Sequence, residues 1–186
     1  MRVFDTEMPD VKIIEPNIHE DERGYFFEAY NAQKFEEVFG FIPKFCQTNE
    51  SFSRKGAIRG LHLQREPYAQ AKLVRVISGK VFDVVVDCRL NSSSFGKCVA
   101  IELSASSHKQ IWIPKGFAHG FQVLSEYCVF SYQVDNLYNR SSEVTINAFD
   151  PGLEIHWPLK NKAKRSAKDC EGIYFDELTT VSIHSV

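Results

Sequence analysis

The sequence predicts an all-β domain, and three observations favour that class. Aromatic residues that favour strands are abundant, with 15 Phe and 7 Tyr among 186 residues. Helical periodicity is scarce along the chain. Short apolar segments recur about every ten residues between turn signals, which is typical of a sandwich, a barrel or a jelly roll. A chain of this length is most simply one domain, here residues 1–186, and can bury a substantial core.

One short helix is predicted in the first part of the chain. Before it, alternation over residues 11–16 predicts a strand, residues 21–24 a turn and residues 25–30 a second strand. Asn31 can then serve as an N-cap, since apolar residues follow it at helical spacing. Gly40 is expected to end this helix.

Beyond residue 44 the pattern becomes that of strands. Two apolar segments flank Ser78 and Gly79, and this arrangement predicts a hairpin. The polar and basic region 160–168 predicts a loop, followed by a short segment around Ile173. Strands are predicted over residues 72–77, 80–86, 97–103, 110–113, 119–124, 128–134 and 143–149.

Charge and hydropathy exclude several kinds of partner. The net charge of −2 and the isoelectric point near 6.3 provide no strong basic field for nucleic acid or anionic lipid. No apolar run approaches the length of a membrane span, and the N-terminus lacks the apolar core of a signal peptide. We therefore expect a cytoplasmic protein with no nucleic-acid or membrane partner.

The five cysteines are widely scattered, odd in number and without a CxxC pair. This distribution argues against a disulfide framework and against a zinc knuckle.

The segment 57–64 carries the strongest chemical signal. It places Arg59, Gly60 and His62 in a run where Val and Ile would suffice for a strand. Arginine can hold an anion, and imidazole can exchange a proton near neutral pH. A lone histidine in a strand is nevertheless more often a structural residue. Strict alternation places Arg59 and His62 on opposite faces, so both can line one cavity only if Gly60 marks a bulge.

A second segment contains a turn, Pro114 to Gly116, followed by His119. This spacing resembles the second motif of the cupin superfamily, PxGxxH. Metal-binding cupins have HxH in their first motif, whereas this chain has His62 followed by Leu63 and Gln64. A mononuclear site generally needs three or four protein ligands, and two histidines do not suffice. We therefore predict no metal.

Lys72 is a better functional candidate than an average lysine. By strand periodicity it shares a face with Val74 and Val76, and a charge on an apolar inner face is costly without a partner or a function. Tyr132 and Tyr138 each fit the simpler description of a half-buried strand tyrosine when taken alone.

Together these segments resemble the dTDP-4-dehydrorhamnose 3,5-epimerase family over most of the chain. The matching motifs follow one another in the family's order and at compatible spacing. They are residues 21–28, 47–49 with Ser51, 59–62, 70–76, 79–84, 112–121, Tyr132, Glu143, 150–151, 155–158 and 166–169.

The resemblance implies a jelly-roll, cupin-like β barrel with a few short helices, assembled as a homodimer. It implies a dTDP-4-keto-6-deoxyhexose substrate, inverted at C3 and C5 on the way to dTDP-L-rhamnose, with no cofactor. His62 would be the base, Tyr132 the proton donor, Asp169 the acid paired with His62, and Lys72 the lysine near the sugar carbonyl. Tyr138 would stack on the thymine ring. The further substrate-binding positions implied are Arg23, Glu28, Gln47, Thr48, Asn49, Arg59, His119, Glu143 and Lys168.

The required chemistry is consistent with these roles. Epimerisation beside a ketone needs a base on one face of the sugar, an acid on the other, and a group that stabilises the enolate oxygen. Three alternatives remain open at this point. They are an epimerase that acts at one carbon of a related keto-deoxysugar, a metal-dependent cupin oxygenase, and a sugar-binding jelly roll without activity.

Overall fold

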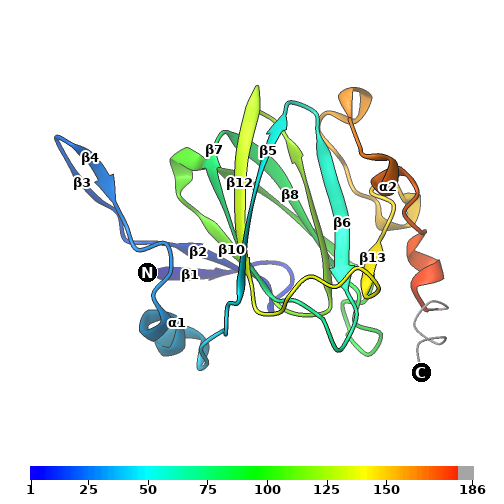
Figure 1. Cartoon of the computed structure of the whole chain (residues 1–186), viewed down its shortest axis with the longest axis horizontal. Helices are drawn as coiled ribbons and strands as arrows, with labels where there is room; N and C mark the ends of the chain where they lie inside the picture. Colours follow the sequence, from blue (N-terminus) through cyan, green and yellow to red (C-terminus); the bar gives the residue numbers. More distant parts are fainter. Residues whose placement is uncertain (180–186) are drawn as a thin grey trace.

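The computed structural model describes residues 1–179, and two antiparallel sheets face each other across its interior (Figure 1). In spatial order, the six-stranded sheet contains β1 (Arg2–Asp5), β2 (Lys12–Glu15), β10 (Gln110–Ile113), β7 (Lys72–Ser78), β12 (Tyr127–Val134) and β5 (Gln47–Arg54). The five-stranded sheet contains β13 (Glu143–Thr145), β6 (Ile58–Gln64), β11 (Phe117–Val123), β8 (Lys80–Asp87) and β9 (Cys98–Ser104). This arrangement confirms the all-β jelly roll, although in the part described the two sheets are not joined into one closed ring.

A small hairpin, β3 (His19–Asp21) with β4 (Gly24–Phe26), forms a separate two-stranded sheet. It projects away from the two large sheets, at the opposite end of the molecule from β13 and the C-terminal helix α2 (Ala167–Cys170) (Figure 1). The strand predicted over residues 25–30 is therefore shorter than expected, since pairing ends at Phe26.

The predicted helix is confirmed as α1 (Ala32–Phe39). The side chain of Asn31 accepts the backbone N–H of Lys34, and Gly40 adopts a left-handed conformation with φ of 78°. Both ends are thus capped by the residues that the local sequence indicated. Among the helices of residues 1–179, none has the length and apolar character needed to span a membrane.

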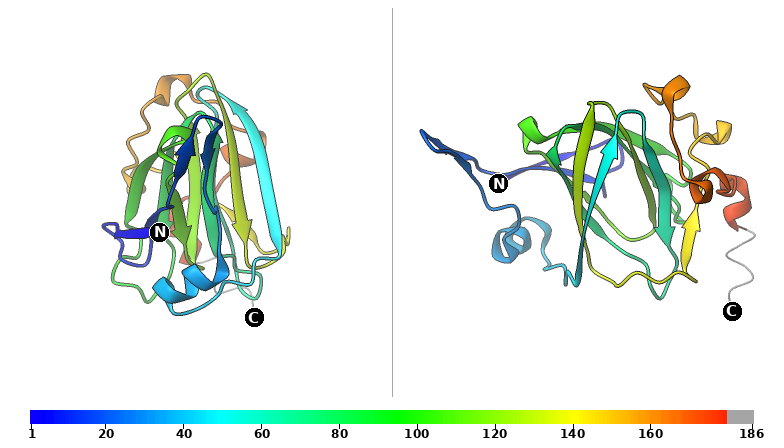
Figure 2. Two further views of the ribbon diagram at one scale, coloured as in Figure 1. Left: turned by 90° about the vertical axis from the view of Figure 1, so that its left-hand side faces the viewer. Right: turned by 45° about the horizontal axis from the view of Figure 1, so that its top comes forward.

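Three apolar clusters stabilise this arrangement. The largest fills the space between the sheets, with Val74 and Phe130 from one sheet meeting Val85 and Phe121 from the other. A second lies on the outer face of the five-stranded sheet, where the C-terminal segment covers it through Trp157 and its neighbours. In the third cluster α1 packs on the outer face of the six-stranded sheet. Figure 2 shows these outer layers on opposite sides of the sheets. The space between the sheets is therefore filled largely by apolar side chains, and polar side chains found there are candidates for a functional role.

The hairpin predicted at Ser78 and Gly79 is wrong. β7 pairs with β10 and β12, whereas β8 pairs with β11 and β9, so the turn carries the chain from one sheet to the other. Gly79 has φ of 87° and lies close to the backbone of Tyr127, where a Cβ would be 2.1 Å from the carbonyl oxygen. A tight turn with Gly is a local signal, and it does not specify which strands pair beyond it.

Two further segments differ from the prediction. β13 ends at Thr145 instead of continuing to residue 149, because Ile146 instead forms an isolated bridge with Ile173. Region 160–168, expected to be a loop, contains a 3-10 turn (Lys160–Lys162) and the start of α2, whose N-cap is Ser166. Further 3-10 turns lie at Ala105–Ser107, Pro151–Leu153 and Phe175–Glu177. Residues 180–186 of the predicted domain lie outside the described residues.

Candidate active site

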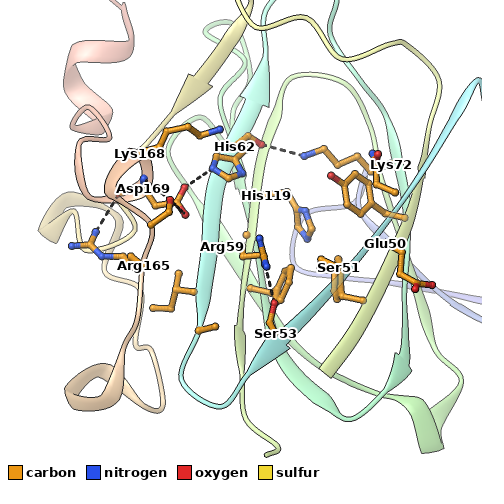
Figure 3. Close-up of a pocket in the computed structure, with 18 of the residues that line it drawn as sticks. Glu50, Ser51, Ser53, Arg59, His62, Lys72, His119, Arg165, Lys168 and Asp169 are labelled. Carbon is orange, nitrogen blue, oxygen red and sulfur yellow. Dashed lines mark hydrogen bonds and ion pairs between the residues drawn. The ribbon is translucent and has the colours of Figure 1, made fainter. Parts of the chain in front are cut away.

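A cavity of about 790 Å³ lies between the two sheets and is lined by polar side chains from both (Figure 3). The five-stranded sheet, with α2 beside it, and the six-stranded sheet provide opposite walls. Ten of the residues that the sequence assigns to the site line it, namely Asn49, Arg59, His62, Lys72, His119, Tyr132, Tyr138, Glu143, Lys168 and Asp169.

A bulge in β6 brings Arg59 and His62 to the same wall. His62 pairs with His119 and Arg59 pairs with Phe121, so two residues of β6 face the single residue Gly120 of β11. The extra residue shifts the alternation of β6 by one position, so Arg59 and His62 face the same side, as a bulge allows in an antiparallel pair. Gly60 has φ of 113°, and a Cβ there would lie 2.6 Å from the carbonyl oxygen of His119. Glycine is therefore required at residue 60. The bulge that the sequence requires, if Arg59 and His62 are to line one cavity, is present.

His62 is held by a carboxylate from α2. Its Nε2 lies 2.6 Å from Oδ1 of Asp169, and Ser166 donates to Oδ2 of Asp169 at 2.8 Å. Asp169 is 4% exposed. Burial acts to raise the pKa of Asp169, but the hydrogen bond and charge interaction with His62 outweigh it and the net pKa is lowered. An ionised Asp169 accepts the Nε2–H, which leaves the lone pair on Nδ1 of His62 for use as a base.

A second imidazole–carboxylate pair lies deeper in the same wall. His119 Nε2 lies 2.9 and 3.1 Å from the two carboxylate oxygens of Asp83. Asp83 is completely buried, and burial lowers the pKa of His119 despite the opposing effect of Asp83. Sequence reasoning overlooked Asp83, although it is the one charged residue between Lys80 and Asp87 in an apolar strand. Like Lys72, Asp83 is a charge on an apolar strand, which is costly without a partner or a function.

Lys72 enters the cavity from the six-stranded sheet. Its side chain is buried with Val74 and Val76, as the period-2 pattern predicted, and Nζ donates to the backbone carbonyl of His62 at 3.2 Å. Burial lowers the pKa of Lys72 to about 8, against the opposing charges of Asp83 and Glu143. A buried ammonium with so little competition from solvent is suited to stabilise a developing oxyanion.

Tyr132 lies in the wall opposite His62. It projects from β12, directly across from Asn49 of β5, into the cavity. Burial raises the pKa of Tyr132, and a hydrogen bond with the Asn49 side chain partly offsets that rise. The phenol is therefore protonated at neutral pH and can act as a proton donor.

Cationic and aromatic side chains line the rest of the cavity. Arg59 donates to Ser53 at 2.8 Å, and Lys168 is paired with Glu143 at 2.7 Å. The Tyr138 hydroxyl donates to the other oxygen of Glu143 at 2.9 Å, while half of its side chain remains exposed. Two cations beside an exposed aromatic ring suit an anionic group linked to a planar base.

Four predicted site residues do not line the cavity. Arg23 lies in the turn of the β3–β4 hairpin and is paired with Asp21, and Glu28 is paired with Lys34 near the base of the hairpin. Gln47 and Thr48 lie on β5, but Gln47 is bonded within the protein and Thr48 faces outward. Within residues 1–179 no group of three or more His, Cys, Asp or Glu is arranged to hold a metal ion.

Comparison with known proteins gives consistent results. The family model described as dTDP-4-dehydrorhamnose 3,5-epimerase matches residues 5–177. A Shigella flexneri protein of that name is 50% identical over 175 residues, covering 94% of this chain and 96% of the relative. An Escherichia coli (strain K12) protein of the same name is 46% identical, covering 98% of this chain and 99% of the relative.

Two solved structures are similar over nearly the whole chain. A Legionella pneumophila dTDP-6-deoxy-D-glucose-3,5-epimerase in complex with dTDP-4-keto-L-rhamnose has a TM-score of 0.91 and 45% identity, and the match covers 94% of this chain and 93% of that one. A 3′-monoepimerase from Streptomyces bikiniensis in complex with dTDP-quinovose also has a TM-score of 0.91, at 27% identity, covering 96% and 90% of the two chains.

Proposed function

The chain belongs to the dTDP-4-dehydrorhamnose 3,5-epimerase family, and from this premise we propose that it inverts C3 and C5 of dTDP-4-keto-6-deoxy-D-glucose to give dTDP-4-keto-L-rhamnose. It is an isomerase of nucleotide sugars. The observation that carries the proposed mechanism is the position of the two proton-transfer groups. The His62–Asp169 pair and Tyr132 line one cavity from opposite sheets, as an inversion at carbon requires.

Each inversion would proceed through an enolate. His62 removes the proton from a carbon adjacent to the C4 ketone, and the resulting imidazolium is stabilised by Asp169. Lys72 donates to the C4 oxygen, where negative charge develops. Tyr132 then delivers a proton to the opposite face of the same carbon, which reverses its configuration. C3 and C5 both flank the ketone, so the same groups can act on them in turn, once His62 has lost its proton to solvent and Tyr132 has regained one from solvent.

In this arrangement the diphosphate and the thymine ring of the substrate contact cavity side chains that take no part in proton transfer. Arg59 and Lys168 provide positive charge for the diphosphate, and Tyr138 provides a ring for the thymine. A chain with a net charge of −2 needs such local cations to bind a nucleotide anion.

The configuration of the product tests this function. We expect incubation with dTDP-4-keto-6-deoxy-D-glucose to yield a sugar inverted at both C3 and C5, as judged from proton coupling constants by NMR. The alternative is inversion at one carbon, which the similarity to a 3′-monoepimerase brings into consideration. Identity is higher to the 3,5-epimerases, and a product inverted at one carbon would contradict our proposal.

The alkaline limb of the pH profile depends on Lys72. Burial lowers the pKa of this lysine to about 8, so the ammonium that stabilises the enolate is lost as the pH rises through that value. We expect kcat/KM to decrease above about pH 8, because this parameter reports ionisation of the free enzyme. Lys72→Met should be slow throughout and lack this limb. An unchanged limb in Lys72→Met would assign the ionisation to another group.

The resemblance implies that Arg23 and Glu28 bind substrate, yet neither lines the cavity of its own chain. These positions favour a homodimer in which the β3–β4 hairpin reaches the cavity of the partner subunit. The hairpin projects away from its own sheets (Figure 1), and it exposes Tyr25 and Phe26 at 59% and 67%. Isolated two-stranded hairpins are marginally stable in water, and large exposed aromatics favour an interface. A nucleotide would then be bound by groups from both chains.

Mixing two inactive variants tests this arrangement. His62→Ala lacks the base and Arg23→Ala lacks the hairpin cation, so a mixed dimer would contain one intact cavity. After subunit exchange, about a quarter of wild-type activity is expected for random pairing of two protomers. Activity no greater than the sum of the separate variants would show that Arg23 acts in its own chain or not at all.

We place this activity in one domain and in the cytoplasm. The catalytic groups come from strands along most of the chain, and within the described part the five cysteines are free thiols, as in a reducing compartment.

A further inference from the structure

The side chain of Gln47 is bonded at both ends within the protein. Its Oε1 accepts the backbone N–H of Tyr138 at 3.1 Å, and its Nε2 donates to Oδ1 of Asn49 at 2.7 Å. Gln47 is half-buried and is not part of the cavity wall. The resemblance to the family places this residue among the substrate-binding positions, but its amide is occupied before any substrate binds.

The bond from Gln47 determines which end of the Asn49 amide faces Tyr132. Because Oδ1 of Asn49 is taken by Gln47, Nδ2 is the end that remains for the Tyr132 hydroxyl, which lies directly across the β5–β12 pair. An amide N–H is a donor only, and donation from Asn49 to the phenolic oxygen fits the direction of its effect, since the Asn49 side chain opposes the rise in the Tyr132 pKa. The Tyr132 proton is then free to point into the cavity. A reversed amide would present an oxygen and bind that proton instead.

We infer that Gln47 is a positioning residue, which orients Asn49 so that the Tyr132 proton is directed at the substrate and which links this orientation to the segment carrying Tyr138. This inference rests on the proposed function, since it assigns Tyr132 as the acid. It adds a link between two parts of the site. A change in the Tyr138 segment on nucleotide binding would be transmitted through the Gln47 amide to the group that completes the inversion.

Gln47→Glu is the informative substitution. It retains the acceptor for the Tyr138 N–H but replaces the donor by an acceptor, so Asn49 must turn its Nδ2 toward residue 47 and its Oδ1 toward Tyr132. We expect formation of inverted product to fall about tenfold, the effect of one misdirected hydrogen bond. Deuterium exchange of the substrate in D₂O needs His62 and Lys72 but not Tyr132, so its rate should change by less than about threefold.

Gln133→Glu is the matched control. It introduces the same charge one residue from Tyr132, but on the face of β12 that points away from the cavity, so the ratio of product to exchange should stay at the wild-type value. Asn49→Asp places an acceptor beside Tyr132 directly and should reproduce the effect of Gln47→Glu.

Titration of Tyr132 gives a readout that does not depend on turnover. With ¹³C-labelled tyrosine, and the signal assigned through Tyr132→Phe, the pKa of Tyr132 should be higher in Gln47→Glu than in wild type and unchanged in Gln133→Glu. A raised KM with an unchanged product-to-exchange ratio and an unchanged titration would overturn the inference, since Gln47 would then act on substrate binding alone. Equal loss of exchange and product would also overturn it. Failure of the proposed function is distinguishable from these outcomes, because wild type itself would then show no exchange, or exchange and inversion at one carbon only.

Discussion

Replacing His62 with alanine is expected to abolish epimerisation while the fold is retained. The side chain is 29% exposed at the cavity wall and contributes no apolar packing to the three core clusters. Loss of a positioned general base costs about 10² to 10⁴ in rate, and here the same base would serve both carbons. We therefore expect kcat to fall by at least about 10³ with little change in circular dichroism.

His156→Ala is a suitable control for this experiment, because His156 is exposed and lies outside the cavity. It should retain wild-type activity. Substantial turnover by His62→Ala, at more than about a tenth of the wild-type rate, would exclude His62 as the base.

Replacing Tyr132 with phenylalanine is expected to separate proton exchange from inversion. The substitution removes one hydroxyl and keeps the ring packed against Phe130 and its neighbours. His62 can still form the enolate and return a solvent-derived proton to the same face, so deuterium should enter the substrate. Delivery to the opposite face loses its donor, and formation of inverted product should fall by about 10² or more.

Tyr127→Phe provides the control, because Tyr127 lies on the same strand but at an exposed position away from the cavity. Integration of the substrate and product signals by NMR in D₂O measures both processes in one sample. If Tyr132→Phe slows exchange and product formation to the same degree, a separate role as the proton donor is contradicted.

The features that the sequence predicted well are local ones. The limits of α1 follow from Asn31 and Gly40, each of which caps the helix through its own backbone or side chain. The inward position of Lys72 follows from strand alternation. The turn at Gly79 was also recognised, but its role in crossing between sheets depends on pairing with distant strands. Periodicity contains no information about such pairing.

The site could be predicted from the sequence to a similar extent. A histidine beside an arginine, and a lysine in an apolar strand, are visible as departures from what a strand requires. Asp83 shows the same departure and was overlooked. The pairing of His62 with Asp169 joins residues 107 positions apart, and without the family resemblance no local rule connects them. Arg23 lies on a hairpin that leaves the cavity of its own chain, which no property of a single strand could indicate.

The most direct test of the account is the uptake of deuterium at C3 and C5 of dTDP-4-keto-6-deoxy-D-glucose in D₂O, followed by NMR in parallel for wild type and His62→Ala. If one base in one cavity serves both carbons, wild type will incorporate deuterium at C3 and C5 and accumulate the doubly inverted sugar, and His62→Ala will incorporate it at neither position above the uncatalysed rate. Exchange confined to one carbon in wild type, or exchange that persists at either carbon in His62→Ala, would contradict that claim.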